Sequence, residues 1–137
     1  MIRETHHSKK ETKRRGFLTM EFAMVMPILA VVLFALFEFS LLFSARTSIV
    51  EACRKGARLA TVPGVHPEDI EHEVRRVLPT RLSNQCQVRT IVGENTGDAV
   101  SVVVRVPMRF ASPDLLWPIG FSLKGQFLQS EARMLKE

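Results

Sequence analysis

The sequence lacks the motifs of common enzyme chemistry. It has no glycine-rich phosphate-binding loop and no nucleophile elbow. His66 and His72 have neither the i,i+4 spacing nor the companion Cys, Asp or Glu residues of a zinc site. His6 and His7 stand in a basic N-terminal stretch. We therefore expect a protein that is not an enzyme, with no catalytic residue, no metal site and no cofactor.

The sequence also lacks the signature of a nucleic-acid-binding protein, although its formal net charge is +5. Residues 1–16 hold six basic residues against two acidic ones, and no aromatic residue precedes Phe17. A nucleic-acid-binding surface would place basic residues among aromatic ones on a folded face. By the positive-inside rule, the basic stretch instead marks the end of the chain that stays in the cytoplasm.

Charge is absent from residues 22–37, and if Glu38 is tolerated the apolar run reaches Phe43. Those 22 residues are enough to cross a hydrocarbon core of roughly 30 Å. The run is longer than that of a signal peptide, and no clear small-x-small cleavage site follows it. We predict a cytoplasmic leader over 1–16, a single transmembrane helix in the inner membrane over 17–43, and a periplasmic or extracellular domain over 44–137.

The junction between the leader and the apolar run carries a spaced pair of residues. Gly16 closes the leader, and Glu21 is the fifth residue counted from Phe17. This junction resembles the type IV prepilin processing site. The resemblance implies that a prepilin peptidase cleaves after Gly16, that Phe17 becomes the mature N-terminus, and that Glu21 pairs with a terminal amine during assembly. A carboxylate at the entry of a membrane helix needs such an opposite charge.

Further motifs narrow the resemblance to the TadE-like family of tight-adherence (Flp-type) pilus assembly. That family typically has Glu-Phe-Ala, a Leu-Pro-like pair, Glu-Phe-Gly and then Ala-Arg-x-Gly-Ala-Arg. The chain has counterparts at 21–23, 26–27, 38–40 and 52–58, but with Ser40 for the glycine and Cys53 for an alanine. The resemblance covers about residues 14–61. It implies a pseudopilin or minor pilin whose partners are membrane lipid, the prepilin peptidase, other pilins and the pilus secretion machinery.

Beyond the apolar run, the residue periodicity predicts a small α+β domain of pilin-like shape. Helical spacing continues over 44–61, so the first helix is expected to run from Phe17 to Thr61. The charged face of the following helix reads as a solvated surface. Period-two alternation then predicts a three-stranded antiparallel sheet that the two helices cover. The expected second helix and strands are 67–78, about 85–92, 99–110 and 121–133.

Three side chains of this arrangement carry specific expectations. Cys53 on the first helix and Cys86 on the first strand both face the proposed core. A disulfide between them is allowed outside the cytoplasm and would add about 3–4 kcal/mol in the chain-entropy model, whereas the alternative is two buried free thiols. Glu38 is expected near the far membrane interface, where its carboxylate reaches water.

A second hypothesis is an unprocessed, signal-anchored envelope protein that binds a protein partner. In this hypothesis Glu21 lies in the cytoplasmic headgroup region. The segment Leu115-Leu116-Trp117 or the open edge of the third strand then binds the partner. Local packing of that segment is the simpler explanation for its apolar residues. The N-terminus of the mature protein distinguishes the two hypotheses, because a pilin begins at Phe17 and an anchored protein at Met1.

Overall fold

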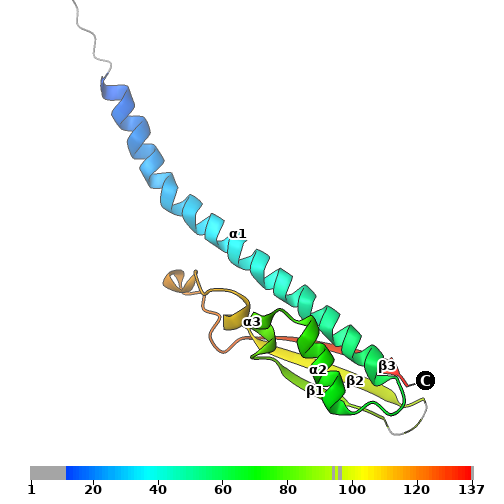
Figure 1. Cartoon of the computed structure of the whole chain (residues 1–137). Helices are drawn as coiled ribbons and strands as arrows, with labels where there is room; N and C mark the ends of the chain where they lie inside the picture. The colour runs from blue at the N-terminus through cyan, green and yellow to red at the C-terminus, as the bar shows by residue number, and fades with distance from the viewer. Residues whose placement is uncertain (1–11, 94, 96, 137) are drawn as a thin grey trace, which may run out of the picture.

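One long helix, α1 (Thr12–Ala60), carries a small head beside its C-terminal half (Figure 1). The structure is a computed structural model that describes residues 12–93, 95 and 97–136, with side chains from Phe17 onward. Most of the predicted leader, residues 1–11, lies outside the described part. The α+β class and the long first helix predicted from the sequence are confirmed.

The exposure of its side chains divides α1 into two halves. Between Phe17 and Phe37 no side chain is buried, and the large apolar ones are exposed. From Glu38 onward, buried positions recur at helical spacing where the head packs on the helix. The helix changes direction within its N-terminal half (Figure 1), where Pro27 lacks the backbone donor of a helical hydrogen bond. One half is thus an exposed apolar rod and the other supports the head.

The second helix, α2 (Pro67–Val77), packs against α1. Pro67 suits the first turn because the N–H that it lacks would have no partner there. Glu68 and Asp69 lie at the positive end of the helix dipole, and Asp69 Oδ2 accepts a hydrogen bond from the backbone N–H of His66 at 3.3 Å. These features explain why the helix begins where the sequence predicts.

The sheet contains β1 (Gln87–Ile91), β2 (Ala99–Pro107) and β3 (Phe127–Leu135), all antiparallel and in the order β1-β2-β3. Val104 pairs with Val88 on one side and with Ser130 on the other. Both helices cover the same face of the sheet, and the alternation predicted for β2 is confirmed. The valines of β2 that are fully buried under the helices are Val100, Val102, Val104 and Val106.

Close packing of α1 on α2 and the sheet depends on Gly56. A Cβ atom at this position would lie 2.7 Å from Val74 Cγ2 and 3.4 Å from Val102 Cγ1. Both valines are fully buried and cannot move away without disturbing their neighbours. Glycine therefore allows the helix to approach the head this closely.

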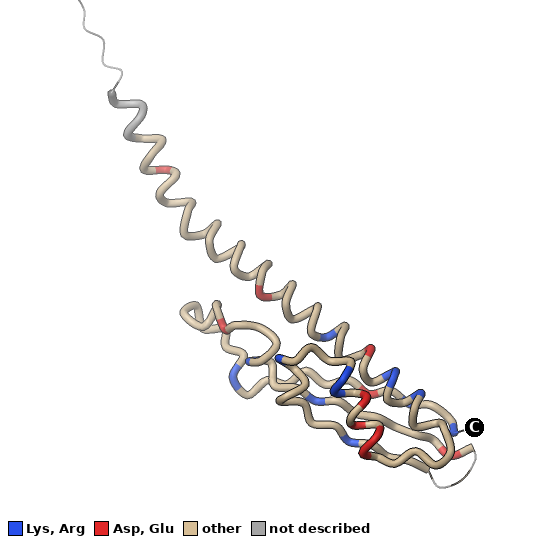
Figure 2. Tube along the Cα trace, viewed as in Figure 1, with Lys and Arg blue, Asp and Glu red and all other residues tan. Residues whose placement is uncertain are grey.

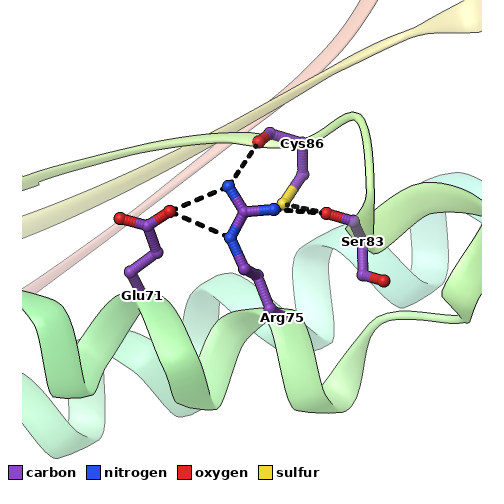
Figure 3. Close-up of polar contacts among 4 residues, drawn as sticks. All are labelled: Glu71, Arg75, Ser83 and Cys86. Atoms are coloured by element: carbon purple, nitrogen blue, oxygen red, sulfur yellow. Dashed lines mark hydrogen bonds and ion pairs between the residues drawn. The ribbon is translucent and has the colours of Figure 1, made fainter.

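Arg75 joins α2 to the segment that leads into β1 (Figure 3). Its Nε and Nη2 atoms lie 2.9 and 2.8 Å from Glu71 Oε1. The guanidinium also donates to the backbone carbonyls of Ser83 and Cys86, the latter at 3.2 Å. The sequence predicts a solvated surface here, but one member of that charged face holds two parts of the head together.

The predicted strands differ from the observed ones in two places. Residues 108–110 form a short helix, α4 (Met108–Ala111), because Pro107 cannot donate a hydrogen bond to extend the ladder. Residues 121–126 form a loop in which Gly125 has a φ of 78°, and β3 therefore begins later and ends later than expected. The sequence also did not predict two short helices, α3 (Thr80–Ser83) and η1 (Trp117–Ile119).

Candidate processing and assembly site

The predicted processing site lies inside α1. The helix runs unbroken from Thr12, so the Gly16–Phe17 peptide bond is within it. The Phe17 side chain is exposed, and Glu21 follows about one helical turn later. The Glu21 side chain is exposed and has no hydrogen bond or ion pair with any described residue. The geometry thus places Gly16, Phe17 and Glu21 at one end of one helix and leaves the carboxylate accessible to another molecule.

From Phe17 to Phe37, no other charged side chain lies on the helix around Glu21. Glu21 is thus the one charged position on this part of α1, whereas charged positions are frequent in the head (Figure 2). The most apolar 18-residue window of this helix has a mean hydropathy of 2.5. In the part of the chain that the structure describes, α1 is the one helix long and apolar enough to cross a membrane. A single helix of this kind near the N-terminus suggests membrane anchoring.

Glu38 does not lie where the sequence predicts. Its side chain is only 1% exposed, and neither carboxylate oxygen has a hydrogen-bond partner among the described residues. The neighbouring Phe39 packs against Phe121, with ring centroids 6.2 Å apart, so a loop of the head reaches α1 at this level. The expectation that the carboxylate reaches water is wrong. Helical spacing alone could not reveal that a segment eighty residues later folds against this turn.

The two cysteines are buried free thiols in the structure. Cys53 Sγ donates to the carbonyl oxygen of Ser130 at 3.3 Å, and Cys86 Sγ donates to that of Ser83 at 3.2 Å. Burial raises the pKa of both thiols; for Cys86 the nearby Arg75 partly offsets this effect. Each sulfur therefore has its own hydrogen-bond acceptor and favours the protonated form.

The described residues contain no group of three or more His, Cys, Asp or Glu side chains that could hold a metal ion. They do contain a groove of about 470 Å³ at the end of the head near α4. Arg109, Lys124 and Phe127 are among the residues that line it. The sequence offered no signal for this groove, because half of its lining comes from residues 123–126, which were predicted to be part of a strand.

The comparison with protein families found one similarity, and it covers most of the N-terminal helix. The model of the family described as TadE-like protein matches residues 16–58. Over this segment the chain is similar to the TadE-like family. The match begins at Gly16 and ends within the head-bearing half of α1, so it confirms the resemblance predicted from the motifs. No curated protein and no solved structure compared with the chain matches it.

The TadE-like family gives the chain a coarse functional context. It suggests a role related to the tight-adherence pilus, and it is a structural rather than an enzymatic family. The matched segment contains Gly16, Phe17 and Glu21 as well as the buried Glu38. Most of the head, from residue 59 onward, lies outside the match.

Proposed function

We propose that this TadE-like chain is a pseudopilin or minor pilin, a structural subunit in the assembly of a tight-adherence pilus. A prepilin peptidase removes the leader after Gly16, and the mature chain begins at Phe17. Before assembly, the subunit is anchored in the inner membrane, with its N-terminus in the cytoplasm and its head on the periplasmic side. The secretion machinery then transfers it to the growing assembly, where it packs against other pilins.

The observation that carries this proposal is Glu21, the single charged residue between Phe17 and Phe37. An unpaired carboxylate in lipid is costly, so its retention on an otherwise apolar surface calls for a partner. The described residues supply none. Cleavage after Gly16 would create an ammonium group on each subunit, and this group is the cation that the Glu21 of a neighbouring subunit requires.

The first prediction concerns the N-terminus. In cells that produce a prepilin peptidase, the mature chain should begin at Phe17, because the peptidase removes residues 1–16. Intact-mass measurement and N-terminal sequencing of the protein purified from membranes check this. A mature protein that still begins at Met1 would contradict processing and favour the signal-anchored alternative.

The second prediction concerns Glu21→Ala. The variant should insert into the membrane and be cleaved normally, because an apolar side chain suits this position. Its incorporation into the pilus or assembly complex should fall about tenfold or more, since losing a buried charge pair costs more than 1.4 kcal/mol. Quantitative immunoblotting of membranes and sheared pili measures both steps.

A matched control for this experiment is Glu51→Ala. Glu51 is an exposed glutamate on the same helix, paired with Lys55 at 3.2 Å, and lies beyond the apolar half. Its replacement should leave incorporation within about twofold of the wild type, because an exposed ion pair contributes little. Undiminished incorporation of Glu21→Ala would rule out the pairing mechanism.

A further inference from the structure

A cluster of exposed apolar side chains lies on one loop of the head, outside the part that matches the TadE-like family. The apolar loop, residues 115–121, contains the short helix η1. Trp117 is 67% exposed and Ile119 is 59% exposed, while Leu115 and Phe121 are each more than one-third exposed. Leu116 between them is buried. Four exposed large apolar side chains within seven residues are unusual for a surface that faces only water.

The apolar loop lies at the level where α1 leaves its exposed apolar half. Phe121 packs against Phe39, two residues after the last position of the run from Phe17 to Phe37. That run of 21 residues is about 31 Å long, close to the thickness of a hydrocarbon core. Figure 1 shows η1 and the adjoining loop at the end of the head nearest the N-terminal half of the helix. The loop and the end of the apolar run therefore share one level along α1.

Basic residues flank the apolar loop in the sequence, and two of them, Arg109 and Lys124, line one groove of the head together with Asp114 and Leu123. Residues 105–127 contain Arg105, Arg109 and Lys124 against one acidic residue, Asp114. The Asp114 carboxylate, just before the loop, accepts hydrogen bonds from the hydroxyl of Ser122 and the backbone N–H of Leu123, just after it. The guanidinium of Arg105 lies 4.1 Å from the ring centroid of Phe127. This end of the head thus combines apolar side chains with a net positive charge, which is complementary to anionic lipid.

We propose that the apolar loop docks on the membrane, with Trp117 and Ile119 at the boundary between headgroups and acyl chains of the exoplasmic leaflet. Arg109 and Lys124 contact the lipid phosphates. Aromatic side chains beside basic residues favour this boundary in membrane proteins generally. The docking rests on the membrane anchoring of α1 in the proposed function. It gives the head a second point of attachment, and the loop leaves the lipid when the subunit enters the pilus.

Trp117 makes the docking directly measurable, because the chain has one tryptophan and no tyrosine. The full-length protein is reconstituted in vesicles of phosphatidylethanolamine and phosphatidylglycerol, some with bromine at carbons 6 and 7 of the acyl chain. Flotation first shows whether the protein is in the vesicles. We expect the bromolipid to quench Trp117 fluorescence and acrylamide to quench it poorly.

Each other outcome overturns the inference in a distinguishable way. If Trp117 in floated vesicles is open to acrylamide and insensitive to bromolipid, the loop faces water. If both quenchers fail, protein covers the loop, and a second copy of this chain becomes the occupant. If the protein does not float, the membrane anchoring fails, and with it the proposed function.

A pair of variants tests whether the apolar side chains hold the loop in place. Ile119→Glu should raise the acrylamide quenching constant of Trp117 at least about twofold, because a carboxylate opposes entry into an anionic interface. The matched control is Ile91→Glu, since Ile91 is 67% exposed on β1 at the opposite end of the sheet. It should leave the quenching unchanged. Equal effects of the two variants would overturn the docking.

Discussion

At the scale of single residues, Glu38 is the least expected feature of the molecule. Its carboxylate is buried, and no described residue donates a hydrogen bond to it. Burying such a group without a partner costs free energy, so this residue does not stabilise the fold. It lies between the exposed rod and the supporting half of α1.

The third prediction follows from this burial. Glu38→Leu should raise the free energy of unfolding by about 1–3 kcal/mol, because an apolar side chain of similar size removes the desolvated carboxylate. Chemical unfolding of the full-length protein in detergent, followed by circular dichroism, measures the change. Glu51→Leu, at an exposed position of the same helix, should change it by less than about 0.5 kcal/mol. A clear loss of stability in Glu38→Leu would show that the carboxylate has a stabilising partner.

At the scale of elements, the position of α2 depends on polar as well as apolar contacts. Ile70 and Val74 bury its inner face, while Arg75 reaches across to carbonyl groups before β1. A backbone carbonyl that loses a charged donor and stays partly buried is left poorly satisfied. The short segment between α2 and β1 is therefore held at its middle, at Ser83, and at its end, at Cys86.

The fourth prediction compares two adjacent arginines of α2. Arg75→Ala should lower the free energy of unfolding by about 1–3 kcal/mol, because two carbonyls and Glu71 lose a common donor. Arg76→Ala should lower it by less than about 1 kcal/mol, since Arg76 makes one exposed pair with Glu73. Both variants remove one positive charge and one ion pair with a glutamate. The difference between their changes in the free energy of unfolding therefore reports on the carbonyl contacts of Arg75. Equal effects in urea unfolding would contradict the proposed importance of Arg75.

At the scale of the whole molecule, the sequence predicted the order of the main elements but not how the loops fold back. Periodicity located α1, α2 and the buried face of β2, because each buries one regular stripe. It missed α4 and the late start of β3, which depend on Pro107 and on turns at glycines. The spacing of residues at the leader junction identified Gly16 and Glu21 as candidates. The burial of Glu38 arises from a distant loop, which local sequence patterns cannot predict.

The fifth prediction concerns the two thiols in the folded head. Cys53 and Cys86 should react slowly with iodoacetamide at pH 8 in the folded protein, and both should react in urea without reductant. Burial raises the pKa of both thiols. The contribution of the protonated thiols to the free energy of unfolding is therefore complete below the ordinary thiol pKa, and it is lost as the pH rises through the pKa of the folded state. Stability should therefore decline in alkaline solution. Failure of both thiols to react in urea would reveal a disulfide.

The place of β3 has a consequence for the biogenesis of the protein. This strand follows every other described element in the chain, yet it pairs with β2 along nine residues and lies against α1. If the head crosses the membrane as proposed, it cannot close until β3 has crossed as well, so it folds only after residues up to Leu135 have been translocated. Until then, the valine-rich strand β2 has an unpaired edge that is open to pairing with another chain.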